Sequence, residues 1–169
     1  MKSLYFVFML TILMSCLNDD DNLSQNPIDQ LPPETQIGAD TFGFSVNGEA
    51  INVTNTSQQT ALYGGGILQL GGGIDNSEMD IGVIIRVEGP LSLNTNYDLT
   101  NTPTNNAIFV NNGEGCYYDF PETIEGFLRL TRFDQTNFIV SGTFEFSNVT
   151  DNCEDVVITN GRFDMHYTP

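Results

Sequence analysis

After Gly38 the chain alternates between apolar and polar residues with a period of two, which is the pattern of half-buried β-strands. The alternation is clearest at residues 79–87, 127–133 and 138–146. In the first of these segments, the side chains expected to face the core are Met79, Ile81, Val83, Ile85 and Val87. No segment shows helical periodicity over the roughly 11 residues that a helix prediction requires. The pattern therefore predicts an all-β domain.

Tight turns separate the alternating segments. Asn47-Gly48 predicts a β-hairpin, because both positions of a type I′ turn need positive φ. Residues 134–137 predict a second hairpin, and Asn160-Gly161 is either a turn or a bulge in one long strand. Shorter candidate strands lie at residues 42–46, 50–53, 67–70, 97–100, 107–110, 116–119, 156–159 and 162–167. About nine or ten short strands in all predict an antiparallel β-sandwich or a flattened β-barrel.

The N-terminus has a different pattern. Lys2 precedes an apolar run at residues 4–14 that Thr11 interrupts, and Cys16 follows shortly after it. A helix that crosses a bilayer needs about 20 apolar residues, so this run is too short to span a membrane. A positive start, a short apolar centre and a small residue before the cut are typical of a secretory signal peptide. The sequence thus predicts a signal peptide at residues 1–15.

The end of this segment, Leu13-Met14-Ser15-Cys16, resembles the bacterial lipobox. The resemblance implies that the Cys16 thiol forms a thioether to diacylglycerol and that Cys16 becomes the first residue of the mature chain. Two or more acyl chains hold a protein stably at a membrane. We therefore expect a lipoprotein of the outer membrane that contacts the membrane through its lipid anchor. The alternative is an ordinary secreted protein in which Cys16 stays unmodified.

Residues 16–37 are rich in Asp, Pro and amide side chains and have no apolar periodicity. Such a segment cannot fold by itself, so it predicts a flexible acidic tether with a reach of about 25 Å. A single antiparallel β domain is expected at residues 38–169. The run Asn18-Asp19-Asp20-Asp21 is similar to the acidic export signal of surface lipoproteins, which implies display on the cell surface. The alternative is a solvated linker on a protein that stays on the periplasmic face.

Charge and cysteine content restrict the partners and the compartment. The chain has 5 Lys and Arg against 22 Asp and Glu, a net charge of −17, and no basic patch that would attract nucleic acid. We expect a protein or glycan partner of unknown identity, no nucleic acid and no cofactor. With Cys16 assigned to the lipid, Cys116 and Cys153 form an even pair in an oxidising compartment, which predicts a disulfide. The alternative is two free thiols.

The sequence predicts no catalytic residue. His166 is the sole histidine and is expected to be structural, and Ser141 lacks the G-x-S-x-G spacing of an activated nucleophile. Two carboxylates about 5 to 9 Å apart can hydrolyse glycosides, but solvated surface charge is the preferred interpretation here. The candidate carboxylates are Asp80, Glu88, Glu122, Glu125 and Asp164.

Three further features have structural interpretations. Asp151, Asn152, Glu154 and Asp155 offer oxygen ligands, but their spacing matches no EF-hand, so we predict a solvated turn next to Cys153 and no metal site; a structural calcium site is the alternative. The glycine triplets at residues 64–66 and 71–73 are expected to let strands bend or to let large side chains of a facing sheet approach. Cross-strand ion pairs are expected at the arginines, and an anionic ligand pocket is the alternative. These arginines are Arg129, Arg132 and Arg162, the last with Asp164 on the same strand face.

Residues 41–48, 141–146 and 158–164 carry the motifs TFGxxVNG, SGTFxF and ITxGRFD. They resemble a family of small Bacteroidota lipoproteins of unknown function. The resemblance implies a fold and a compartment, and it implies neither an activity nor site residues. We therefore expect a non-catalytic binding or accessory lipoprotein whose ligand is unknown. The alternatives are a secreted, glycosidase-like hydrolase that uses a carboxylate pair and a structural component of the envelope.

Overall fold

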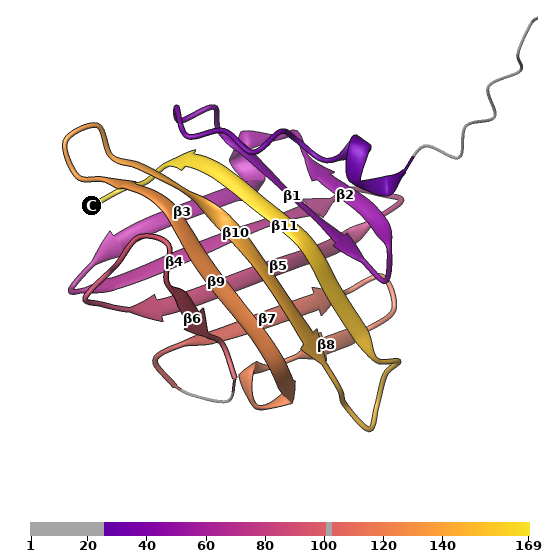
Figure 1. The fold of residues 1–169 in the computed structure, drawn as a ribbon. Helices are drawn as coiled ribbons and strands as arrows, with labels where there is room; N and C mark the ends of the chain where they lie inside the picture. Colours follow the sequence, from indigo (N-terminus) through magenta and orange to yellow (C-terminus); the bar gives the residue numbers. More distant parts are fainter. Residues whose placement is uncertain (1–25, 101–102) are drawn as a thin grey trace, which may run out of the picture.

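The computed structural model describes residues 26–100 and 103–169, which fold into two antiparallel sheets packed face to face (Figure 1). The first sheet has six strands in the order β2-β1-β11-β10-β9-β6, and the second has five in the order β3-β4-β5-β7-β8. The all-β prediction is confirmed, and the sheets form a sandwich rather than a closed barrel. The predicted signal peptide, Cys16 and the first part of the predicted tether lie outside the described residues.

The first sheet consists of β1 (Thr41–Val46), β2 (Glu49–Val53), β6 (Asn96–Asp98), β9 (Thr123–Asp134), β10 (Ile139–Asn148) and β11 (Val156–His166). The second consists of β3 (Gln59–Gly64), β4 (Ile67–Asp75), β5 (Asp80–Glu88), β7 (Asn106–Asn111) and β8 (Cys116–Tyr118). Short 3₁₀ helices are η1 (Pro27–Gln30), η2 (Thr56–Gln58) and η3 (Phe120–Glu122). No helix within the two described ranges is long and apolar enough to cross a membrane.

The described residues contain eleven strands, more than the nine or ten that the sequence predicts. The pattern missed β3, an edge strand whose short, mixed sequence shows no clear alternation. β11 continues through Asn160-Gly161, where its register with β10 shifts and Asn160 adopts a φ of 54°. Asn160-Gly161 is therefore a bulge within one strand and not a hairpin turn.

Aromatic side chains of the first sheet fill the space between the sheets. Phe42 and Phe144 are fully buried, and their ring centroids lie 5.5 Å apart. The Phe42 ring rests on Gly72 of β4, where an added Cβ would lie 2.5 Å from Phe42 Cδ1. This confirms that the second glycine triplet admits a large side chain from the facing sheet. Burying each ring stabilises the fold by about 2 kcal/mol.

The two sheets are joined at one end of the sandwich. Just after β11, Thr168 N donates to Ala61 O (2.9 Å), and Tyr63 N of β3 donates to Thr168 O (2.8 Å). Val156, at the opposite end of β11, lines an opening between the sheets. The sheets are therefore joined by backbone hydrogen bonds at one end, and a pocket opens between them at the other.

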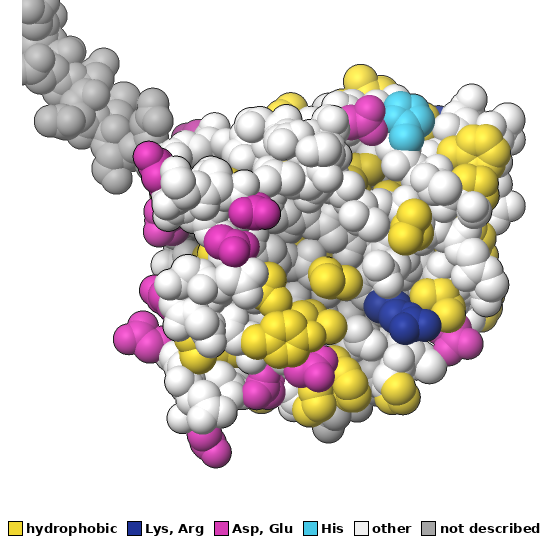
Figure 2. Space-filling view, turned by 180° about the vertical axis from the view of Figure 1, so that it is seen from behind, with side chains coloured by type: hydrophobic (Ala, Val, Ile, Leu, Met, Phe, Trp, Pro, Cys, Tyr) yellow, Lys and Arg dark blue, Asp and Glu magenta, His cyan; other side chains and the backbone are white. Residues whose placement is uncertain are grey.

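The outer face of the second sheet carries apolar side chains. Leu62, Ile84 and Tyr117 are 44%, 42% and 57% exposed. Figure 2 views this side of the molecule, where hydrophobic side chains are spread between acidic ones near the margins. Exposed single apolar residues are common on soluble domains, so they do not by themselves mark a binding site.

An N-terminal strap, residues 31–40, crosses the outer face of the first sheet. Leu31 is 7% exposed, and Pro32 packs on Gly43, where an added Cβ would lie 2.6 Å from Pro32 Cδ. Arg162 Nη1 donates to Pro32 O at 3.5 Å. The predicted boundary between tether and domain at Gly38 is therefore corrected, since the chain already packs on the domain at Leu31.

Asp164, on the outer face of β11, holds this strap. It is only 1% exposed, and its carboxylate accepts five hydrogen bonds. Oδ2 accepts from Thr35 Oγ1 (2.6 Å), Ile37 N (2.9 Å) and Ala39 N (3.1 Å), and Oδ1 accepts from Gly38 N (2.9 Å) and Ser141 Oγ (2.7 Å). Burial by itself would raise the pKa of Asp164, but these hydrogen bonds outweigh it and lower the pKa to about 2. Asp164 is thus a structural carboxylate that fixes the N-terminal segment.

Candidate ligand-binding site at the mouth of the sandwich

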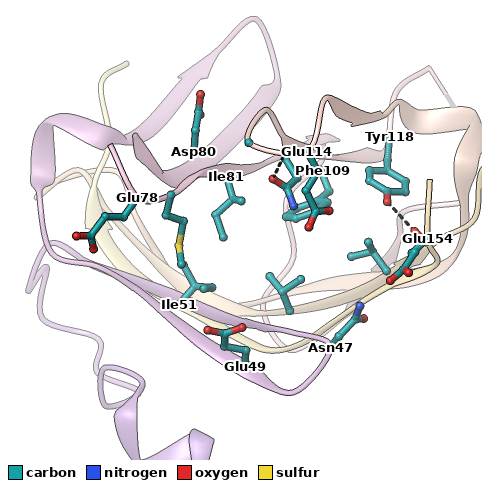
Figure 3. A pocket seen from close by; sticks show the side chains of 15 residues that line it. Asn47, Glu49, Ile51, Glu78, Asp80, Ile81, Phe109, Glu114, Tyr118 and Glu154 are labelled. Carbon is teal, nitrogen blue, oxygen red and sulfur yellow. Dashed lines mark hydrogen bonds between the residues drawn. The ribbon is translucent and has the colours of Figure 1, made fainter. Parts of the chain in front are cut away.

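Loops of both sheets surround the open end of the sandwich and form a hollow that we call the mouth pocket (Figure 3). Its volume is about 430 Å³. Small-molecule sites typically measure about 300 to 1,000 Å³, so the mouth pocket has the size of a ligand site. It is lined by Val46, Asn47, Glu49, Ile51, Glu78, Met79, Asp80, Ile81, Phe109, Asn111, Gly113, Glu114, Tyr118, Glu154 and Val156.

The inner wall of the mouth pocket is apolar. Ile51 of β2, Ile81 of β5 and Val156 of β11 belong to the core and contribute side chains to this wall. Buried Phe109 of β7 also lines the inner side of the pocket, and half-buried Met79 lies just before the first residue of β5. An apolar group that entered here would leave water and contact both sheets.

The rim of the mouth pocket is acidic. Five carboxylates line it, and none of its described lining residues is Lys, Arg or His. Glu49, Glu114 and Glu154 lie around the opening, whereas Asp80 points away from it (Figure 3). Asp80 Oδ1 accepts a hydrogen bond from Asn112 Nδ2 at 3.1 Å, which holds it outside the pocket. Three carboxylates therefore face a ligand in the opening, those of Glu49 at the start of β2, Glu114 in the β7–β8 turn and Glu154 in the loop before β11.

The Asn47-Gly48 turn fixes one side of the mouth pocket. The φ angles of 49° at Asn47 and 89° at Gly48 confirm the hairpin turn predicted from the sequence. Asn47 Oδ1 accepts from Val157 N at 2.8 Å, and Asn47 N donates to Val157 O at 2.9 Å. The turn is therefore bonded to the start of β11, and the side of the pocket that carries Glu49 is held in place.

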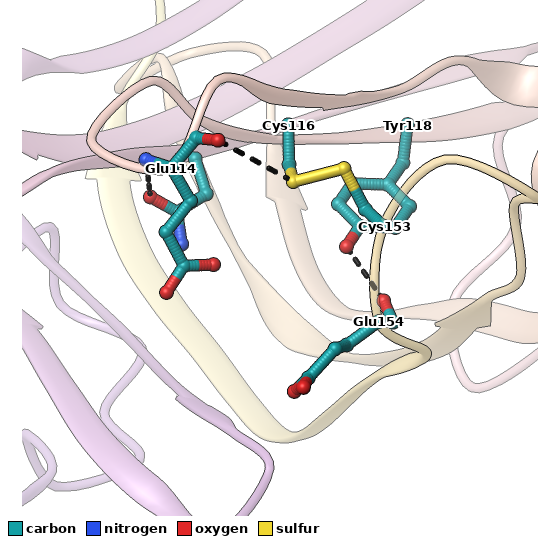
Figure 4. Close-up of a disulfide and its surroundings, with 6 residues drawn as sticks. Glu114, Cys116, Tyr118, Cys153 and Glu154 are labelled. Carbon is teal, nitrogen blue, oxygen red and sulfur yellow. Dashed lines mark hydrogen bonds between the residues drawn. A yellow bond between two sulfur atoms is a disulfide. The ribbon is translucent and has the colours of Figure 1, made fainter.

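The predicted disulfide between Cys116 and Cys153 is confirmed and ties the other side of the mouth pocket (Figure 4). It joins β8 of the second sheet to the loop before β11, and the two Cα atoms are 6.1 Å apart. Next to it, Tyr118 Oη donates to Glu154 O at 2.6 Å. Both bonds hold the loop that carries Glu154 against β8.

Replacing both cysteines, Cys116→Ser with Cys153→Ser, is expected to lower the free energy of unfolding by about 3 to 4 kcal/mol, because the unfolded chain loses a covalent loop closure. Urea unfolding of the double variant and of the oxidised parent measures the difference. The parent in reductant is the control and should match the double variant. Equal unfolding midpoints for the oxidised and reduced parent would contradict a stabilising disulfide.

The pKa of Tyr118 reports the electrostatics of this side of the pocket. Burial raises it first, and the negative charges of Glu114, Glu154, Asp155 and Glu122 raise it further. Tyr118 is 2% exposed, so its hydroxyl stays protonated and remains a donor to Glu154 O. The acidic rim thus acts on a buried group of the pocket wall.

The carboxylates predicted as candidates for hydrolysis have other surroundings. Asp80 and Glu88 are the two ends of β5, roughly 25 Å apart along a strand, which is too far for a catalytic pair. Glu122 Oε2 accepts from Asp119 N in the capping box of η3, and Glu125 Oε1 accepts from Ser147 Oγ. Asp164 binds the N-terminal strap.

The other predicted residues have structural partners. His166 Nδ1 lies 3.0 Å from Asp40 Oδ1, and buried Ser141 donates its hydroxyl to Asp164. Arg132 pairs with Asp134 at 2.6 Å, within the same strand β9 and not across strands as expected. Arg162 and Asp164 do not pair with charged cross-strand partners as expected, because the N-terminal strap takes those positions. Arg162 donates to Asn160 O and Pro32 O.

The loop at residues 151–155 contributes Glu154 to the mouth pocket. Across residues 26–100 and 103–169 no group of three or more His, Cys, Asp or Glu side chains is arranged to hold a metal ion. The mouth pocket itself was not predicted, because Glu49, Glu114 and Glu154 lie far apart in the sequence and share no common motif. Each of them lies in or beside a turn, and they form one site only because the fold brings these turns together.

No family model, curated protein or solved structure matches this chain. The family resemblance of the three motifs therefore stays a prediction, and the candidate site rests on the geometry of this chain.

Proposed function

We propose that the protein is a lipid-anchored binding protein of the outer membrane, displayed on the cell surface, whose mouth pocket holds a small ligand without transforming it. The observation that carries the binding role is the mouth pocket, with its apolar inner wall, its charged rim and a volume of about 430 Å³. The lipobox at residues 13–16 supports the anchor, and the acidic run behind Cys16 supports surface display.

The surroundings of the buried carboxylate favour binding over hydrolysis. A glycosidase needs one carboxyl group whose pKa is raised so that it can donate a proton. Asp164 has the opposite shift, to about 2, and its oxygens are occupied by the strap and Ser141. Two alternatives compete with binding in the experiment below. One is a hydrolase that uses another carboxylate pair, and the other is a structural role in the envelope.

A thermal-shift screen of small metabolites and glycans against residues 16–169, with Cys16→Ser so that no lipid is added, tests the binding role. Gly113→Trp is expected to abolish stabilisation by every true ligand, because the indole fills the mouth pocket. An added Cβ at Gly113 lies 3.4 Å from its nearest neighbour, Asn111 Oδ1, so the backbone can accept it.

Gly64→Trp is the matched control, because Gly64 lies at the end of β3 and an added Cβ there meets nothing within 4 Å. It should leave each thermal shift unchanged. Ligands that stabilise the parent and Gly113→Trp equally would contradict binding in the mouth pocket. Turnover of a hit compound would favour the hydrolase, and a screen without hits would favour the structural role.

A further inference from the structure

Two features of the mouth pocket, which lie at different depths, define the chemistry of its ligand. Deep in the pocket, Ile51, Ile81 and Val156 offer apolar surface from both sheets. At the opening, Glu114 and Glu154 offer negative charge, and no described lining residue offers a positive one. A complementary ligand therefore has an apolar body and a positively charged end.

We propose that the mouth pocket binds a small organic cation, a primary amine on an alkyl or aryl body. This inference rests on the proposed binding function of the same pocket and names the class of its ligand. The apolar body packs against Ile51, Ile81 and Val156, and the ammonium group lies at the rim between Glu114 and Glu154.

The backbone that carries the rim carboxylates is held before a ligand arrives. Glu114 N donates to Asn111 O at 3.2 Å within the β7–β8 turn, and Cys116 Sγ lies 3.9 Å from Glu114 O. Glu154 is held through its carbonyl by Tyr118 and lies next to the disulfide at Cys153 (Figure 4). Because the backbone is already ordered, binding costs less conformational entropy, and the charges at the rim can contribute to selectivity.

Charge separates this ligand class from the others. An anion would meet Glu49, Glu114 and Glu154 together, in a chain of net charge −17, and would be repelled. A bare metal ion would gain nothing from the apolar wall, whereas an amine uses both the wall and the rim. The negative field of the whole domain also steers cations toward the surface.

Benzylamine, benzyl alcohol and benzoate test the class, because they share a ring and differ in charge at neutral pH. Binding to residues 16–169 with Cys16→Ser is measured by chemical-shift changes of the Ile51, Ile81 and Val156 methyl groups. Benzylamine is expected to bind about tenfold more tightly than benzyl alcohol, and benzoate more weakly than either. Added salt should weaken the binding of benzylamine and leave that of benzyl alcohol unchanged.

The double variant Glu114→Gln with Glu154→Gln is expected to weaken benzylamine binding about fivefold, since exposed charge pairs each contribute modestly. The control, Glu34→Gln with Glu88→Gln, makes the same charge change at exposed sites outside the pocket lining and should bind as the parent does. Benzyl alcohol binding as tightly as benzylamine would overturn the cation class and leave the binding function standing. Equal benzylamine affinity in the two double variants would also overturn the cation class, and so would the absence of benzylamine binding. The Gly113→Trp screen would then decide the binding function separately.

Discussion

Asp164→Ala is expected to lower the free energy of unfolding by about 3 to 5 kcal/mol, because buried Ser141 loses its acceptor and the strap loses the carboxylate that holds it on the sheet. The strap should detach from β11, because three backbone amides of the strap donate to this one carboxylate. Hydrogen exchange should therefore accelerate at Ile37, Gly38 and Ala39. Urea unfolding gives the free energy, and Glu88→Gln at an exposed position is the control for loss of charge.

The same carboxylate sets a pH dependence. The folded-state pKa of Asp164 is about 2, below its ordinary value of 3.8, so its contribution of about 2 kcal/mol is complete above pH 4. That contribution is lost as pH falls from about 4 through 2, where the carboxylate takes up a proton in the folded state. Asp164→Asn should remove this part of the acid destabilisation. Identical slopes of stability against pH below pH 4 in the parent and the Asn variant would contradict the assignment.

Cys16→Ser is expected to move the protein from the membrane fraction to the soluble fraction, because the hydroxyl cannot form the thioether that carries the lipid. Incorporation of labelled palmitate should fall to background, and mass spectrometry of the parent should find an acylated Cys16. The control, Cys116→Ser with Cys153→Ser, also replaces cysteines, those of the disulfide, but should remain in the membrane fraction and keep its label.

Protease treatment of intact cells separates the two faces of the outer membrane. The parent is expected to be degraded, because the acidic run behind Cys16 is interpreted as a surface-export signal. Full protection of the parent would place it on the periplasmic face.

In the fractionation experiment, a Cys16→Ser variant that stays in the membrane fraction would contradict the lipid anchor itself.

The strap changes the expected distance between membrane and domain. The sequence predicts a tether that continues to residue 37, whereas the structure packs residues 31–40 on the first sheet. From Cys16 to Asn26, the first described residue, the chain spans at most about 35 Å. On the lipid-anchor proposal, the domain therefore stays closer to the membrane than a free tether to residue 37 would allow.

Local patterns were sufficient to predict much of the fold. The Asn47-Gly48 hairpin and the β9–β10 hairpin follow from turn chemistry, and the alternation in β5 identified buried Ile81, Val83 and Ile85. β3 was missed because an edge strand needs apolar residues on few positions. The strap was missed because Leu31 is held by packing and Thr35 by Asp164, 129 positions later in the chain.

The disulfide was predicted from parity and compartment, but the mouth pocket was not predicted. Its carboxylates come from turns that are far apart in sequence, and nothing local indicates that these turns converge. Asp164 was considered as a catalytic or ion-pairing residue, because its hydrogen bonds to a distant polar segment leave no mark in the sequence. Periodicity of apolar residues does not predict contacts between polar residues that are far apart in the sequence.

The location of a bound ligand tests the account most directly. For each compound that stabilises the chain in the screen, intermolecular NOEs between ligand protons and protein methyl groups identify the binding surface. The account predicts NOEs to Ile51, Ile81 and Val156 in the mouth pocket. NOEs to Leu62 and Ile84 instead would place the ligand on the outer face of the second sheet and contradict the mouth pocket as the binding site.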